Sequence, residues 1–417
     1  MRYATRALLA CLSLSPAPAL AWDWSLDSTI SETVSASDNQ FMRSMLAGGT
    51  LASYTNVTAN ALARTQTSRL TIDANVGYQK YWGPGTEGIN QTESNSLGVN
   101  ARYETWGKNQ QDREWLIGTF SQSSTVVAVL NDLGFATRAN GNTERVMVGG
   151  GVQRSLSALD TISISATSSL TAFDPASAGT QFTDSTVTGT WRRQISPLTT
   201  VSATSQVEWL SYNTTPHSDV IILRNTAGFD TSISRVLSYG GSAGVIYSSS
   251  QGGTASQFGP SIFPTTSATG GSTVGFIGDA HAIYRILKNT TLNLMVGQSV
   301  SPSVLGTLAK RTTLHAGLDQ IINGRSSVSI AGDISRQTTS GTTSDFFSSS
   351  ITYSYILARD WNASLTYRYL HRTATSGGAL VFDPVTGLPI IGGAGPASSN
   401  TIMAVLSKHT NIIPLGD

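Results

Sequence analysis

The chain has 417 residues, of which 12% are charged and 39% hydrophobic, and its formal net charge is +1. The charged share is about half of that in an average soluble domain. A chain this close to neutral has no electrostatic footprint for nucleic acid. Its single cysteine, Cys11, leaves no thiols for a disulfide framework or a thiolate metal site.

Residues 1–21 have the organisation of a secretory signal. Arg2 and Arg6 precede an apolar stretch that runs from Ala7 to Leu14, and Ala19 and Ala21 place small residues at the two positions that a signal peptidase reads. The apolar stretch is too short to span a bilayer. We therefore expect residues 1–21 to be a cleaved signal peptide and residues 22–417 to be a single folded unit in the outer membrane.

Apolar and polar residues alternate along most of the chain. From Thr161 to Ala172 the odd positions are all Ser or Thr, and the even positions are mostly apolar. The same period of two recurs at 201–211 and 361–369. Such alternation is typical of a strand with one apolar and one polar face. No run after residue 21 is long enough for a membrane helix.

About eighteen such segments follow one another, each about ten residues long, which is the length that a tilted strand needs to cross a bilayer. Strand counts of 16 to 18 fit the pattern, because boundaries are the weakest part of such a reading. In chain order the predicted strands are 26–36, 43–54, 67–81, 93–105, 113–122, 143–154, 160–173, 182–193, 199–211, 220–234, 239–249, 272–286, 290–300, 309–321, 326–337, 346–357, 361–372 and 400–410.

The connections between these segments alternate in length. Short turns are predicted at 156–159, 196–198, 236–238, 287–289, 322–324 and 358–360, and long Gly/Ser/Thr/Pro-rich loops at 123–142, 250–271 and 373–399. Short turns at one end and long loops at the other are typical of outer-membrane barrels. The sequence therefore predicts an all-β fold, a transmembrane antiparallel up-and-down barrel with both termini on the short-turn, periplasmic side.

Aromatic residues gather at the ends of the predicted strands. A girdle at the two membrane interfaces explains this placement, and cross-strand packing in a soluble sandwich is the alternative. The residues are Tyr78, Tyr81, Trp82, Tyr103, Trp106, Trp209, Tyr212, Tyr353, Tyr355, Tyr367 and Tyr369.

The segment from Trp191 to Trp209 combines basic residues, a tight Leu-containing turn, alternating Ser and Val, and a terminal aromatic residue. This hairpin pattern resembles the β-barrel porin 2 family over most of residues 24–410. The resemblance implies an outer-membrane barrel of a kind often associated with exopolysaccharide systems. The expected partners are outer-membrane lipids, the barrel-assembly machinery and polysaccharide-export components, and no nucleic acid.

Charged residues of both signs fall on the polar face of the predicted strands, where they would line the lumen. Neither sign dominates among them, so the sequence predicts no ion preference. The lumen-lining candidates are Asp73, Arg102, Glu104, Arg192, Glu208, Arg224, Asp279, His281, Asp319, Asp333 and Arg368.

Two histidine–aspartate combinations could be read as the base and orienting group of a lipid hydrolase. Asp279 and His281 share one strand face, and His315 and Asp319 share another. Both faces are predicted to point into the lumen, whereas a lipid hydrolase needs its site on the lipid side. We therefore expect no enzyme, no catalytic residues, no cofactor and no metal site.

The function predicted is a passive channel or export conduit, with a polysaccharide as one cargo and the three long loops folded inward to constrict it. A non-conducting structural or adhesive barrel is the second hypothesis, and a lipid-modifying enzyme is a distant third.

Overall fold

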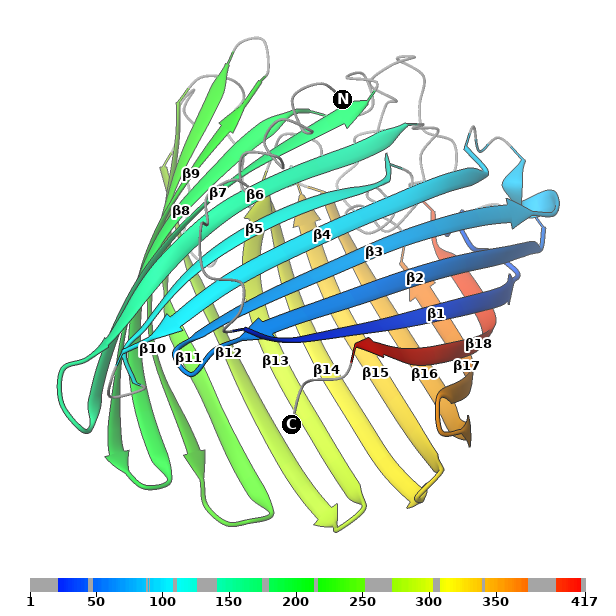
Figure 1. Ribbon diagram of the computed structural model, residues 1–417. Helices are drawn as coiled ribbons and strands as arrows, with labels where there is room; N and C mark the ends of the chain where they lie inside the picture. Colours follow the sequence, from blue (N-terminus) through cyan, green and yellow to red (C-terminus); the bar gives the residue numbers. More distant parts are fainter. Residues whose placement is uncertain are drawn as a thin grey trace.

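The computed structural model describes residues 22–43, 48–87, 89, 91–107, 111–125, 141–174, 180–213, 217–251, 272–302, 308–339, 342–373 and 395–413. Within these residues the chain forms a closed sheet of 18 antiparallel strands (Figure 1). No helix among them is long and apolar enough to cross a membrane.

The strands cover most of the described chain. Their bounds are β1 (Asp23–Ser37), β2 (Thr50–Arg64), β3 (Ser68–Trp82), β4 (Glu93–Trp106), β5 (Arg113–Ser124), β6 (Asn142–Ser155), β7 (Asp160–Asp174), β8 (Phe182–Ser196), β9 (Thr199–Tyr212), β10 (Ser218–Ser232), β11 (Leu237–Gln251), β12 (Ser272–Leu287), β13 (Thr290–Pro302), β14 (Leu308–Asn323), β15 (Ser326–Thr339), β16 (Thr342–Ala358), β17 (Trp361–Arg372) and β18 (Ala397–Ile413). A single turn of 3-10 helix, η2 (Pro84–Thr86), follows β3.

Each strand pairs with its neighbours in the chain, and the first strand pairs with the last. The closing ladder runs from Leu26 opposite Ile413 to Ser37 opposite Thr401. Closure leaves no free sheet edge, which is the requirement for strands that cross a bilayer. The predicted up-and-down barrel of about eighteen strands is confirmed.

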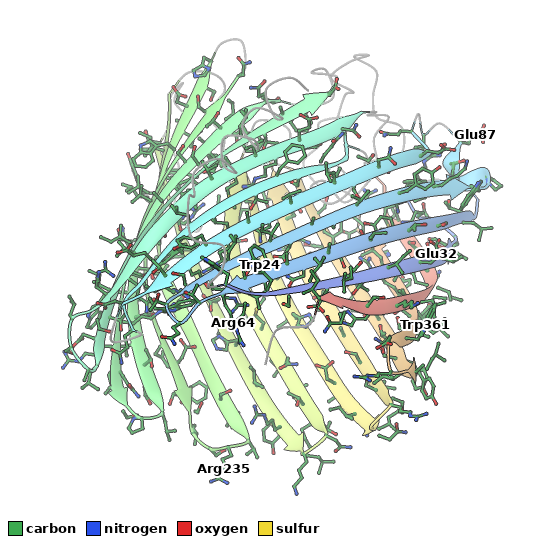
Figure 2. All side chains as sticks on the ribbon, viewed as in Figure 1. Trp24, Glu32, Arg64, Glu87, Arg235 and Trp361 are labelled. Carbon is green, nitrogen blue, oxygen red and sulfur yellow. The ribbon has the colours of Figure 1, made fainter. Side chains whose placement is uncertain are left out.

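Short connections gather at one end of the barrel, which we name the turn end; the opposite end is the loop end (Figure 1). The connections at the turn end include 65–67, 156–159, 197–198, 233–236, 288–289, 324–325 and 359–360. Arg235 lies at this end and Glu87 at the other (Figure 2). β1 begins and β18 ends toward the turn end, because Asp23 pairs with Arg64 and Leu26 with Ile413. Most of 123–142, 250–271 and 373–399 lies outside the described residues.

The second strand differs from the prediction, since it spans Thr50–Arg64 and not 43–54. Phe41 and Met42, which directly precede the predicted strand, are buried side chains of the β1–β2 connection. Gly48 has φ of +94°, and a Cβ at this position would lie 2.8 Å from Cβ of Pro84. This left-handed turn fixes where β2 can begin. Beyond residue 55 the alternation of Asn and Thr with Ala gives too little contrast in hydropathy to mark a strand.

The two faces of the sheet differ in chemistry. Alternate residues such as Asn75, Ser121 and Ser348 line a cavity inside the barrel. The residues between them form an outer surface of exposed apolar side chains, among them Leu116 at 64% and Val148 at 58% exposure. An apolar outer belt around a polar interior is the arrangement of a barrel surrounded by lipid.

Three of the aromatic residues assigned to the interfacial girdle lie on the inner face of the barrel: Tyr81, Tyr212 and Trp106, which is opposite Arg113 on the face that carries Glu104. Tyr81 and Tyr212 are buried at 8% and 0% exposure. Tyr81 packs against Phe41 at 5.2 Å between ring centroids, and Tyr212 packs against Phe182 at 5.5 Å. The prediction is wrong for these three because a position at a strand end does not determine which face of the sheet a side chain occupies.

Candidate functional site: the barrel lumen

A cavity of about 820 Å³ lies inside the barrel. Its lining comes from β1–β5 and β14–β18, ten strands that are continuous around the β1–β18 closure. Hydroxyl groups such as those of Thr33, Ser96 and Thr401 make up much of the wall, together with amides that include Asn75 and Gln79. These groups can donate and accept hydrogen bonds without net charge, so the wall can replace part of the hydration shell of a polar solute.

The ladder register places all eleven predicted lumen-lining residues on the face of the sheet that bears this cavity. Only two of them, Asp333 and Arg368, line the cavity itself. The eleven residues, given with their strands, are Asp73 of β3, Arg102 and Glu104 of β4, Arg192 of β8, Glu208 of β9, Arg224 of β10, Asp279 and His281 of β12, Asp319 of β14, Asp333 of β15 and Arg368 of β17. Their role in a conducting pore stays a prediction.

Two arginines share one carboxylate near the turn end of β4 and β5. Arg102 Nη2 lies 2.9 Å and Arg113 Nη1 3.3 Å from Oε1 of Glu104, whose side chain is 11% exposed. Arg113 also lies over the ring of Trp115, 5.2 Å from its centroid. A carboxylate shared by two guanidinium groups accepts charge-assisted hydrogen bonds, and here these bonds brace two adjacent strands.

A second ion pair joins β9 and β10. Arg224 donates to the carboxylate of Glu208, and its Nη2 donates to the carbonyl oxygen of Val300 at 2.9 Å. The two side chains are only 14% and 4% exposed. Because Val300 belongs to β13, this pair connects the inner wall to a strand three positions further round the barrel.

Near the loop end, the β13–β14 hairpin separates from β12 and leaves the wall of the barrel. The β12–β13 ladder stops at Gly278 opposite Gln298, whereas β13 continues to Pro302, paired with Leu308 of β14. Beyond Gln298 the hairpin packs on the inner wall, where Val300 and Leu308 join a buried apolar cluster. The other members are Phe182, Leu210, Tyr212, Val220, Ile222 and Ile246. Val300 and Leu308 therefore occupy part of the lumen.

The β1–β2 connection is also folded inward. Phe41 and Met42 are 2% and 1% exposed, and Met42 lines the cavity. Asn39 holds the segment in place, because its Nδ2 donates to Arg43 O at 2.8 Å and to Ser398 O at 3.0 Å. Sequence reasoning missed this segment, having assigned part of it to a strand. The predicted constriction by the three long loops lies mostly outside the described residues.

Two histidines inside the barrel, His281 of β12 and His315 of β14, contact aspartate carboxylates. His281 Nε2 lies 3.2 Å from Asp230 Oδ1, and its Nδ1 lies 3.9 Å from Asp279 Oδ2. His315 Nδ1 lies 2.6 Å from Asp333 Oδ1. In the part of the chain that the structure describes, neither imidazole is hydrogen-bonded to a hydroxyl group.

Asp319, which shares a strand face with His315, has other partners. It accepts hydrogen bonds from Asn293, at 3.1 Å, and from Ser329. The described residues contain no group of three or more His, Cys, Asp or Glu side chains arranged to hold a metal ion.

No family model and no curated protein matches the chain in sequence. The resemblance to the β-barrel porin 2 family therefore stays a prediction. Among solved structures, the FrpB iron transporter of Neisseria meningitidis (F5-1 variant, apoprotein form) is similar at 7% identity and a TM-score of 0.50, over 93% of this chain and 81% of that one.

OccK2 (OpdF) of Pseudomonas aeruginosa is similar at 11% identity and a TM-score of 0.49, over 94% of this chain and 99% of that one. OccAB4 of Acinetobacter baumannii is similar at 10% identity and a TM-score of 0.45, over 93% and 98%. Likeness at such low identities concerns the fold, which is that of outer-membrane barrels.

Proposed function

We propose that the protein is an outer-membrane channel through which small water-soluble solutes diffuse passively. The observation that supports this most directly is the cavity of about 820 Å³, walled by hydroxyl and amide groups, inside a barrel with an apolar outer surface. A barrel of 18 strands is wide enough to hold water in its lumen. In this proposal residues 1–21 direct export, and the assembly machinery inserts the barrel among outer-membrane lipids.

Electrical conductance of the purified protein in planar bilayers tests the proposal. Steady, voltage-independent current steps, together with swelling of protein-containing liposomes in a sugar solution, are expected for a passive channel. A non-conducting structural or adhesive barrel would give neither steady current nor swelling, and this result would refute the channel.

The inward-folded segment at residues 39–43 provides a more specific test. Met42 lines the cavity, so Met42→Ala should widen the path and raise the conductance. Val34→Ala is the matched control, because Val34 is 53% exposed on the outer face of β1. Equal conductance of Met42→Ala, Val34→Ala and the unchanged protein would show that the ions do not pass along this cavity.

A polysaccharide is the cargo that we propose for an export function of the channel. The support is the resemblance noted in the hairpin from Trp191 to Trp209, together with a wall whose hydroxyl groups suit a sugar polymer. Deleting the gene should then reduce surface polysaccharide and cause the polymer to accumulate in the periplasm. Unchanged surface polysaccharide in the deletion strain would exclude this cargo.

A further inference from the structure

The boundary between β12 and β13 is hydrogen-bonded over only part of its length. β12 pairs with β11 from Ser272 onward, whereas its ladder with β13 begins only at Gly278, opposite Gln298. Residues 272–277 of β12 and 299–302 of β13 therefore belong to no common ladder. We name this part of the boundary the seam. At about 3.3 Å per residue it is roughly 20 Å long on the β12 side.

The seam lies at the depth of the apolar outer belt. Val274 and Phe276, on the outer face of β12 beside it, are 59% and 60% exposed, and Tyr247 and Val245 of β11 lie opposite them. Beyond the last ladder pair, the side-chain amide of Gln298 donates to the carbonyl oxygen of Phe276. A sheet edge at membrane depth is stable only where it borders protein or a water-filled cavity. The edge of β12 at the seam therefore has to border the lumen or the hairpin that lies inside it.

One face of the β13–β14 hairpin runs from the lipid into the barrel. Toward the turn end, Val296 and Leu314 are opposite each other on this face and are 44% and 47% exposed on the outer surface. At the seam, Val300 and Leu308 occupy the same face, because side chains alternate with a period of two. These two are only 8% and 3% exposed and pack against the inner wall of β8–β11. An apolar surface is thus continuous from the lipid to the interior, and Ile277 of β12 packs against its inner part.

An ion pair on the inner wall holds the hairpin away from β12. Arg224 of β10 donates through Nη2 to Val300 O at 2.9 Å, a carbonyl that lies beyond the end of the β12–β13 ladder. The same guanidinium group pairs with Glu208 of β9. On the opposite face of the hairpin, Arg311 and Thr313 line the polar cavity. The hairpin therefore separates the cavity, which suits water-soluble solutes, from the apolar surface that leads to the seam.

We infer that the seam is a lateral portal through which apolar and amphipathic small molecules pass between the lumen and the lipid leaflet nearest the loop end. A water-soluble solute would lose its hydration on this path, because Phe276 borders it outside the wall and Ile277 and Val300 border it inside. A molecule with an apolar part instead exchanges one apolar contact for another. The portal goes beyond the proposed channel for water-soluble solutes, and neither depends on the other.

Uptake of N-phenylnaphthylamine tests the inference, because this apolar dye fluoresces strongly only in lipid and an intact lipopolysaccharide surface excludes it. Cells with the protein in their outer membrane should take up the dye faster than cells without it. Gly275→Trp places an indole ring at the seam on the inner face of β12, where a Cβ would lie 3.2 Å from Cγ2 of Ile246. This variant should lose the additional uptake. Gly297→Trp is the matched control and should keep it, because Gly297 lies on the same face but within the ladder, opposite Asp279.

A disulfide across the seam provides a second test that does not depend on the tryptophan variants. Residues 22–417 contain no cysteine. If the β12–β13 register continued, Gly275 would lie opposite Ser301, so Gly275→Cys/Ser301→Cys can form a disulfide when the hairpin returns to β12. Oxidation should then abolish the additional uptake, and dithiothreitol should restore it. Ser301→Cys/Ala309→Cys is the matched control, because these two residues already face each other in the β13–β14 ladder; its disulfide should leave uptake unchanged.

Several results would overturn the portal. Uptake that is equal in cells with and without the protein refutes it, and so does uptake that Gly275→Trp and Gly297→Trp reduce equally. Uptake that persists in Gly275→Trp shows that the dye enters elsewhere. If the disulfide across the seam does not form, the hairpin keeps its inward position and the tryptophan variants decide. Planar-bilayer conductance separates the two proposals, because a conducting barrel without dye uptake supports the channel and refutes the portal.

Discussion

Removing the guanidinium group of Arg224 is expected to destabilise the barrel more than removal of a surface arginine. Arg224→Met keeps the length of the side chain but leaves the carboxylate of Glu208, 4% exposed, without its cation. Breaking a buried pair in this way costs about 3–5 kcal/mol. The hydrogen bond to Val300 O is lost as well. Water in the lumen hydrates part of the uncovered carboxylate, which reduces the loss of stability. We expect a loss of about 3 kcal/mol in the free energy of unfolding.

The measurement is equilibrium unfolding by guanidinium chloride in lipid vesicles, followed by tryptophan fluorescence. Glu208→Gln and the double variant Glu208→Gln/Arg224→Met complete a mutant cycle. The loss in the free energy of unfolding of the double variant should be smaller than the sum of the two single losses by more than about 1 kcal/mol. Each single variant already breaks the ion pair, so the sum counts this loss twice.

Arg336→Met is the matched control. Arg336 also forms an ion pair, with Nε 2.7 Å from Asp345 Oδ1, but its side chain is 66% exposed. An exposed pair contributes little to stability, so this variant should unfold close to the unchanged protein. If Arg336→Met and Arg224→Met destabilise equally, or if the two single losses in the cycle add, burial does not govern the strength of these pairs.

Three further predictions use the same unfolding assay. Gly48→Ala should cost about 1–2 kcal/mol because of the positive φ and the proline beside it, whereas Gly49→Ala, whose Cβ would meet only a carbonyl oxygen at 3.8 Å, should be nearly neutral. Val148→Arg places a charge on the lipid face in the middle of β6 and should cost about 2–4 kcal/mol; the neighbouring Met147→Arg points inward and should cost much less. Phe41→Ala should cost about 3 kcal/mol, and an unchanged midpoint would show that the inward segment does not stabilise the barrel.

Most strand positions could be predicted from the sequence because hydropathy alternates strongly in them. β17 was expected at 361–372 and spans Trp361–Arg372, since Leu365 and Tyr367 alternate with Ser364 and Thr366. β2 was misplaced because the Asn, Thr and Ala residues of its second half give weak contrast in hydropathy. Local alternation reports the face of a strand and says nothing of segments that fold back into the lumen.

The contacts inside the lumen were harder to predict than the face that each residue occupies. Arg102 and Glu104 are two positions apart on one strand, so their contact follows from the period of two. The pairing of Arg224 with Glu208 depends on the register across the β9–β10 connection, which hydropathy does not determine. The inward bend of the β13–β14 hairpin depends on packing against β8, β9, β10 and β11, and the sequence has no local pattern that marks it.

The ladder between β1 and β18 has a consequence for the assembly of the barrel. It joins residues at opposite ends of the chain, such as Thr29 and His409, which are 380 positions apart. Until β18 has joined the sheet, β1 and β17 each have one unpaired edge, which is prone to aggregation. A chain truncated before β18 cannot complete the cylinder. Only chains that include β18 can therefore close the barrel. Substitutions that weaken β18 should reduce the amount of inserted protein more than they alter its permeability.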